Sequence, residues 1–113
     1  MKNIIDYLDF EKVDIRVGKI IEVEDFPEAR KPAIKVWVEF GGDIGIKQSS
    51  AQITAHYDPK SLVGKQIIGC LNLGSMRIAG FKSEFLVIGL TASDGSIILI
   101  SPDAPVPNGE KLC

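Results

Sequence analysis

The chain has 113 residues, of which 45% are hydrophobic and 25% are charged, and its formal net charge is −2. This composition excludes a disordered chain, because it supplies enough apolar surface to form a core. No apolar stretch approaches the roughly 20 residues that span a bilayer. The N-terminus reaches an acid at Asp6 and lacks the apolar segment of a signal peptide. We therefore expect one domain over residues 1–113, in the cytoplasm and without membrane insertion.

The first half of the chain predicts a short helix and three strands. Apolar residues near helical spacing predict a helix within residues 1–11. Residues 14–24 predict a long strand with Gly18 at its middle, where a glycine often marks a bulge or a bend. After a proline-containing loop, residues 34–40 alternate as a half-buried strand does, and a Gly-Gly-Asp turn leads into a strand over 44–48. The long strand is expected to place Ile15, Val17, Ile21 and Val23 on one face.

The second half predicts a helix and three further strands. Ser50 is a suitable N-cap for a helix over residues 51–57, which Pro59 would end. The strands are expected over 65–73, 84–90 and 97–100, with a loop over 74–80. The tail, residues 102–113, contains three prolines and is not expected to be helical.

This order of elements is typical of an OB-fold, a small Greek-key barrel whose sheet face and loops bind ligands. We predict an all-β barrel of five to six strands over residues 12–101, with short helices, although other small barrels and sandwiches fit the same order. The apolar runs at 85–88 and 97–100 do not alternate, so both faces of these strands must be covered. The N-terminal helix, the tail or a second copy would cover them, which favours a homodimer.

The sequence offers little for catalysis. His56, Asp58 and Cys70 are of the types used as base, orienting group and nucleophile, but His56 is expected on the solvent side of the short predicted helix. Neither a phosphate-binding P-loop nor a serine nucleophile elbow is present. We therefore do not expect an enzyme.

Metal, cofactor and disulfide signals are also weak. One histidine and two distant cysteines, Cys70 and Cys113, give neither a zinc-ligand spacing nor a disulfide framework. Four acids near the end of the long strand could in principle hold a cation, but a solvated loop is the simpler interpretation: Glu22, Glu24, Asp25 and Glu28. We expect no cofactor and no metal.

Positive charge is concentrated in the middle of the chain. Residues 44–83 contain five basic side chains and one acidic side chain, whereas the two flanking regions are net acidic. A local basic face can bind an anion although the whole protein is acidic, because screening limits the reach of charges to about 8–10 Å. Chance clustering on a solvated surface is the alternative.

One segment of this basic region, residues 72–84, contains groups suited to nucleic acid. Asn72, Arg77, Lys82 and Ser83 are of the types that contact phosphates and base edges. Phe81 is suited either to stacking on an unpaired base or to core packing. The end of the predicted third strand adds Lys47, Ser49 and Ser50, which we expect to face the same groove.

The run Asp14-Ile15-Arg16-Val17-Gly18-Lys19-Ile20, followed by Asn72-Leu73 and Gly80-Phe81-Lys82-Ser83-Glu84, resembles the tRNA-binding domain family. Residues 26–30, 32–35, 44–54, 77–84 and 105–109 bring the chain closer to members described as export-related chaperones. The resemblance implies an OB-fold homodimer, tRNA binding and a groove for extended preprotein segments. It places Asn72, Arg77, Lys82 and Ser83 in the RNA-facing loop and Ser49 and Ser50 along the groove.

The chain departs from the family pattern at the loop. Where the family usually has proline and then two basic residues, this chain has Ser75 and Met76 before Arg77. Ala79 and Phe85 also replace a basic residue and a glycine found in many tRNA-binding members. Losing a cation should weaken phosphate binding, whereas methionine offers an adaptable apolar contact.

Two functions therefore remain open, with a third behind them. One is binding of tRNA by a homodimer. The second is a peptide-binding chaperone for unfolded or export-destined chains, in which Met76, Phe81 and Trp37 contact the peptide. Trp37 has an alternative role, packing under the tail. The third is a scaffold that recruits a tRNA-handling enzyme.

Overall fold

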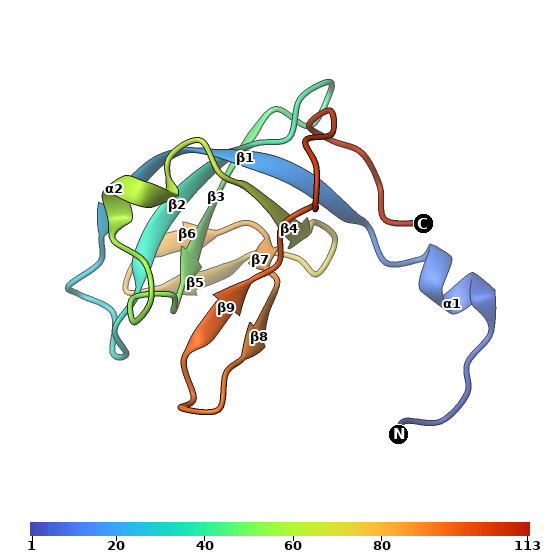
Figure 1. Ribbon diagram of the computed structural model, residues 1–113, viewed down its shortest axis with the longest axis horizontal. Coiled ribbons are helices and arrows are strands. Elements are labelled where there is room, and N and C mark those ends of the chain that lie inside the picture. The colour runs from blue at the N-terminus through green and yellow to red at the C-terminus, as the bar shows by residue number, and fades with distance from the viewer.

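The computed structural model describes all residues, 1–113, and is built mainly of antiparallel strands. The largest sheet has the order β3–β2–β1–β4–β7, and two hairpins complete the fold (Figure 1). The sheet strands are β1 (Ile15–Asp25), β2 (Ile34–Glu39), β3 (Ile46–Ala51), β4 (Gln66–Cys70) and β7 (Leu86–Val87). The hairpins are β5 (Met76–Ile78) with β6 (Phe81–Ser83) and β8 (Gly89–Thr91) with β9 (Ile97–Leu99).

The five-stranded sheet curves into a nearly closed barrel. The chain between β6 and β7 returns beside β3, where the Glu84 N–H donates to the Gln48 carbonyl oxygen at 2.8 Å. The Ser49 hydroxyl donates to the Phe85 carbonyl oxygen, also at 2.8 Å. The predicted all-β, OB-type barrel is thus confirmed.

The barrel interior requires a glycine at position 18. A Cβ atom built there would lie 2.5 Å from Val38 Cγ1 and 2.7 Å from Phe40 Cδ1, so no side chain fits. The predicted bulge lies further on, where the pairing of β1 with β2 shifts between Ile20 and Glu22. This shift buries Ile20 (1% exposed) and leaves Ile21 41% exposed, so the predicted inward face of Ile21 was wrong.

The helix predicted over residues 51–57 is also wrong. Strand β3 extends to Ala51, and the helix that follows is α2 (Pro59–Leu62). Asp58 caps α2 by accepting a hydrogen bond from the Lys60 N–H at 3.1 Å. Pro59 therefore starts a helix instead of ending one, since the first helical turn needs no proline N–H.

Two other expected segments differ. The loop expected over residues 74–80 contains β5, and the strand expected over 84–90 is divided between β7 and β8. Both differences arise because the chain forms a separate hairpin before β7, β5–β6, and another after it, β8–β9.

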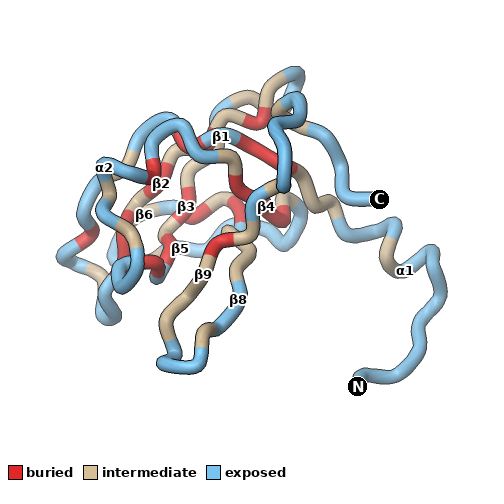
Figure 2. The backbone as a smooth tube through the Cα atoms, in the orientation of Figure 1, coloured by how far each residue is buried: buried red, intermediate tan, exposed pale blue.

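The N-terminal helix lies apart from the barrel. Helix α1 (Tyr7–Glu11) has no buried residue and projects away from the strands (Figures 1 and 2). The apolar side chains of this segment are exposed, among them Ile4 (89%), Ile5 (65%) and Leu8 (71%). Within the chain, α1 therefore does not cover β7 or β9.

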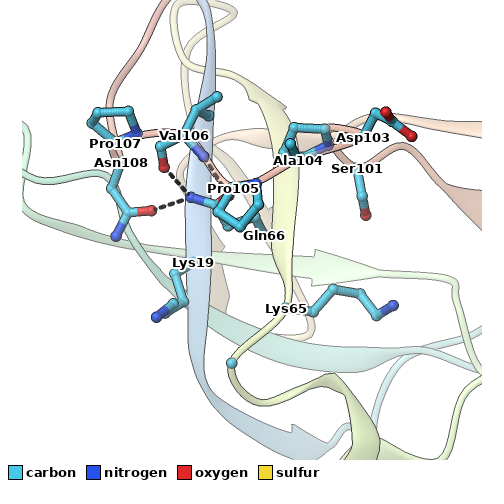
Figure 3. Close-up of a pocket in the computed structure, with 12 residues that line it drawn as sticks. Lys19, Lys65, Gln66, Ser101, Asp103, Ala104, Pro105, Val106, Pro107 and Asn108 are labelled. Atoms are coloured by element: carbon cyan, nitrogen blue, oxygen red, sulfur yellow. Dashed lines mark hydrogen bonds between the residues drawn. The ribbon is translucent and has the colours of Figure 1, made fainter.

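The C-terminal tail is bound to the start of β1. The Gly109 N–H donates to the Val17 carbonyl at 2.7 Å, and the Val17 N–H donates to the Glu110 carbonyl at 3.0 Å. Gln66 holds the preceding segment, because its amide nitrogen donates to the Val106 carbonyl and its amide oxygen accepts from the Val106 N–H (Figure 3). The tail thus occupies the edge of β1 that β2 leaves free.

Candidate functional site

The β5–β6 hairpin presents two different faces. Its two-residue turn, Ala79-Gly80, has positive φ angles of 47° and 83°, and Arg77 pairs with Lys82 across the strands. Directly paired residues project to the same side of a sheet. Because the buried Ser83 faces the barrel, Arg77 and Lys82 share the opposite, solvent-exposed face. The structure thus brings these two predicted cations together.

An aromatic cluster anchors this hairpin to the barrel. The Phe81 ring lies edge-on to Phe26 and to Trp37, with centroid distances of 5.5 Å and 6.0 Å. The Lys35 ammonium lies 4.8 Å and 5.0 Å from the centroids of Phe26 and Phe81. Phe81 is therefore neither in the central core nor a free stacking platform, and Trp37 packs under this hairpin instead of under the tail.

A cationic cavity of about 860 Å³ lies between the hairpin and the loop that joins β1 to β2. Three exposed cations line it, Arg30 and Lys31 from the loop and Arg77 from β5, and none of them forms an ion pair. No acidic residue lines it, and Ser50 and Gln52 add polar groups. We call this space the cationic cavity.

A second cavity of about 580 Å³ adjoins it along β5. Its lining includes Met76 and Ile78 of β5, Leu86 of β7 and the end of β3, and no charged residue lines it. Ser50, Gln52 and Ile78 line both cavities, so the two spaces meet there. We call this second space the apolar cavity.

Lys47 and Lys82 line a third, smaller cavity of about 380 Å³, together with Asp14, Asp43 and Glu84. Three acids surround these two cations, so the field there is more balanced than in the cationic cavity. Lys82 nevertheless remains exposed beside Arg77 on the hairpin.

Three of the predicted site residues are engaged in holding the fold. Asn72 accepts a hydrogen bond from the Asp14 N–H at 2.8 Å and donates to the Lys12 carbonyl at 2.6 Å. Ser49 and Ser83 are buried with hydroxyl oxygens 3.2 Å apart, and the Ser83 oxygen also accepts from the Ser50 N–H. The serine contacts fix the seam of the barrel, and the Asn72 contacts hold the segment that leads into β1, so these groups leave little for a ligand.

Two cations of the cationic cavity, Arg30 and Lys31, were missed in the sequence. They lie in residues 1–43, which are net acidic, so a count of charges by region does not single them out. The signal that could have found them is their adjacency in a loop bounded by Pro27 and Pro32, beside the OB-fold binding face.

The residues considered for catalysis do not form one group. His56 Nε2 lies 2.5 Å from the Ser96 hydroxyl, Asp58 caps α2, and Cys70 is buried. Hydrogen bonds from the Ser96 hydroxyl and N–H lower the pKa of the nearby Asp94 carboxyl. The structure contains no group of three His, Cys, Asp or Glu side chains that could hold a metal ion. None of its helices has the length and apolar character needed to cross a membrane.

The chain matches a known family of domains over most of its length. The model of the family described as "Putative tRNA binding domain" matches residues 15–111. The solved chaperone CsaA from Bacillus anthracis is 43% identical, with a TM-score of 0.91 over 98% of this chain and 100% of its own. The CsaA chaperone from Picrophilus torridus is 49% identical, with a TM-score of 0.89 over 97% of this chain and 100% of its own.

Longer proteins contain the same domain. A methionine–tRNA ligase from Flavobacterium johnsoniae is 32% identical over 98% of this chain, which spans 15% of that ligase. The chain belongs to the tRNA-binding domain family and, within it, to the CsaA-type members.

Proposed function

We propose that this protein is a non-enzymatic, homodimeric tRNA-binding protein of the cytoplasm. The observation that carries the proposal is the cationic cavity, where Arg30, Lys31 and Arg77 converge with no acid in a chain of net charge −2. Phosphates are the anions that such a cluster of guanidinium and ammonium groups suits best. Ser50 and Gln52 supply a hydroxyl and an amide for sugar or base-edge contacts.

The exposed hairpin cation Lys82 extends this surface toward Lys47. An RNA backbone that enters the cationic cavity would follow the solvent face of the hairpin, where Arg77 and Lys82 lie side by side. Of the other predicted contacts, Ser49 and Ser83 hold the hairpin to β3 beneath this surface, whereas Asn72 holds the segment before β1. The family match to tRNA-binding domains and to parts of methionine–tRNA ligases supports tRNA as the ligand class.

The homodimer is proposed from the N-terminal segment. A helix of five residues is far too short to be stable alone in water. Leu8 within it and Ile4 and Ile5 before it are exposed and need a partner surface. Leu90 (63% exposed) leaves apolar area on β8 as well. A second copy offers the same apolar groups in return, as a two-fold interface requires.

A salt series tests tRNA binding directly. Gel-shift titration of tRNA should give an affinity that falls steeply as salt increases, because counterions are released from the neutralised phosphates. Sedimentation should give a mass near twice 12.3 kDa. Undetectable binding at low salt would overturn the tRNA proposal, and a monomer would overturn the homodimer.

A second candidate is a chaperone that binds extended, export-destined peptides. The uncharged apolar cavity favours it, since Met76 lies where many family members have a basic residue and is 67% exposed. The likeness to CsaA chaperones supports it further. Suppression of the aggregation of a denatured protein, unchanged by about 0.5 M salt, would support this role because apolar contacts are not screened. Loss of suppression in salt would contradict it.

A further inference from the structure

Strand β5 has one edge that no other strand covers. Its only partner in the sheets is β6, and no backbone hydrogen bond joins residues 76–78 to another part of the chain. Exposed strand edges are templates for pairing with an added chain. The free edge of β5 can therefore accept an added strand.

The backbone of Arg77 faces outward along this edge. In a hairpin closed by a two-residue turn, the pair next to the turn, Ile78 and Phe81, exchanges backbone hydrogen bonds, and the following pair does not. The N–H and C=O groups of Arg77 and Lys82 therefore point away from each other. On the β6 side the Lys82 carbonyl accepts from Gln48 Nε2 at 2.8 Å, whereas on the β5 side Arg77 has no such partner.

The apolar cavity lies on the face of β5 that carries Met76 and Ile78. Met76 and Ile78 project to one side of β5 and line it, and Leu86 to Gly89 form the other side. A strand added to β5 would direct alternate side chains toward this cavity, because side chains alternate along a strand. Main-chain pairing with apolar contacts at alternate positions is how domains bind peptides of varied sequence.

Charge indicates what the occupant is. No charged residue lines the apolar cavity, and its only aromatic ring, Phe85, is buried. The cavity therefore offers no cation to a phosphate and no accessible ring on which a base could stack. At Ile78 the apolar cavity meets the cationic cavity, whose three cations have no acidic partner. The complementary ligand is an extended peptide with apolar residues at alternate positions and a carboxylate at one end.

We propose that the free edge of β5 binds such a peptide by strand addition, with the outward N–H and C=O of Arg77 making the central hydrogen bonds. This inference rests on the peptide-binding candidate of the proposed function. It adds the mode of binding and the ligand pattern to that candidate. RNA would then share only the cationic end of the groove.

N-methylated peptides test the proposal. The probe is a fluorescent octapeptide in which valine alternates with threonine and a terminal glutamate follows. Every second amide of an added strand would face β5. We expect methylation of this set of alternate amides to weaken binding about tenfold or more, the loss of roughly one good hydrogen-bonded contact. Methylation of the other alternate amides, which would face away from β5, should change the affinity less than about twofold. Equal effects of methylating the two sets of amides, or no binding of the unmethylated probe, would overturn the proposal.

A pair of variants tests it from the protein side. Arg77→Pro and Arg77→Ala remove the same cation, but only proline removes the outward N–H, and it spares the bonds within the hairpin. Arg77→Pro should bind the peptide about tenfold more weakly than Arg77→Ala, whereas both should reduce tRNA binding equally. Equal peptide affinities of two folded variants would count against strand addition, and the methylation series decides if Arg77→Pro does not fold.

The remaining outcomes separate the possible failures. A halved sedimentation mass of Arg77→Pro would show that a second copy occupies the β5 edge, which overturns the peptide proposal. A tRNA gel shift without peptide binding would overturn both this inference and the chaperone candidate, but it would leave the tRNA-binding proposal intact. Loss of both activities in the folded protein removes the proposed function as well.

Discussion

The ring of Phe81 meets the indole of Trp37 edge-on, with centroids 6.0 Å apart and ring planes at 78°. The same phenyl ring contacts Phe26, which begins the loop containing Arg30 and Lys31. One side chain thus fixes the distance between the two walls of the cationic cavity. The hairpin supplies Phe81 and the loop supplies Phe26, while Trp37 of β2 forms the base.

Replacing Phe81 should therefore affect both stability and binding. Phe81→Ala removes a half-buried ring and its edge-on contacts, and we expect a loss of about 2 kcal/mol in the free energy of unfolding. The tRNA affinity should also fall, because the hairpin cation Arg77 loses its fixed position. Urea unfolding followed by the fluorescence of Trp37, the sole tryptophan, measures the first effect. Phe81→Leu should retain most of both, and unchanged stability in Phe81→Ala would contradict the anchoring role.

The turn of the hairpin carries local strain. Ala79 has a φ of 47°, a left-handed conformation that costs an alanine about 1 kcal/mol. Asn-Gly is the preferred pair for a two-residue hairpin turn, so Ala79→Asn should raise the free energy of unfolding by about 0.5–1 kcal/mol. Thermal unfolding should show a higher Tm for Ala79→Asn. Gly80→Ala is the opposite control and should lower the Tm, since Gly80 has a φ of 83°.

Prediction from the sequence succeeded for the long barrel strands and failed for the β5–β6 hairpin. The strand at 34–39 was found because its alternating apolar pattern matches its burial. The strand containing Gly18 was found as an extended apolar segment, although the side chains change faces at the bulge after Ile20. The hairpin was taken for a loop, because Ala79-Gly80 is not a usual two-residue turn. The helix was misplaced because Ser50 resembles an N-cap, although its position in β3 is set by pairing with Lys35.

The candidate site was only partly predictable, for a different reason. Arg77 and Lys82 could be grouped because they are close in sequence, whereas Arg30 joins them only through the tertiary contact of Phe26 with Phe81. The roles of Ser49 and Ser83 depend on barrel closure, which pairs residues 34 positions apart. Sequence spacing alone does not reveal such long-range contacts.

The loop cations offer a charge-matched test of the RNA surface. Arg30→Ala with Lys31→Ala should weaken tRNA binding and lower the slope of log affinity against log salt by roughly 1.5, since each phosphate contact contributes about 0.7–0.9. The matched control is Lys19→Ala with Lys65→Ala, which removes the same charge beside the C-terminal tail. Fluorescence titration at several salt concentrations measures both slopes. Equal slopes for the two double variants would place the RNA elsewhere.

The hairpin turn of β8 and β9 has a carboxylate that responds to acid. The hydroxyl and N–H of Ser96 donate to Asp94, and these bonds lower the pKa of Asp94 below its ordinary value of 3.8. A carboxyl whose pKa is lowered by folding stabilises the fold above its unfolded pKa and loses that effect as the pH falls through its folded pKa.

The Ser96→Ala variant isolates this effect. Removing the hydroxyl should raise the pKa of Asp94 toward its ordinary value, because the largest cause of the shift is the bond from that hydroxyl. A carbon-detected NMR titration of the Asp94 carboxyl measures the change directly. The Tm difference between wild type and Ser96→Ala should narrow as the pH falls below about 4. A pKa that does not move would contradict the role of the hydroxyl and leave the Ser96 N–H and the nearby His56 as the causes of the shift.

The Gln66 side chain offers a final test, on the C-terminal tail. Its amide nitrogen lies 2.6 Å from the Val106 carbonyl oxygen and 3.0 Å from Asn108 Oδ1, and its amide oxygen accepts from the Val106 N–H at 3.2 Å (Figure 3). Gln66→Ala should lose about 1–3 kcal/mol of stability, from three hydrogen bonds of partly exposed groups. Hydrogen exchange should accelerate first at Val106 and then at Gly109, whose N–H bonds to Val17.

Gln66→Glu separates the two halves of this contact. The glutamate still accepts from the Val106 N–H, but it places a carboxylate oxygen where the amide nitrogen faced the Val106 carbonyl and Asn108 Oδ1. Its exchange rates should therefore be at least as fast as those of Gln66→Ala. If Gly109 stays fully protected in Gln66→Ala, its bonds to β1 hold the tail unaided. In that case Gln66 would fix only the proline-containing segment, residues 102–107, against β4.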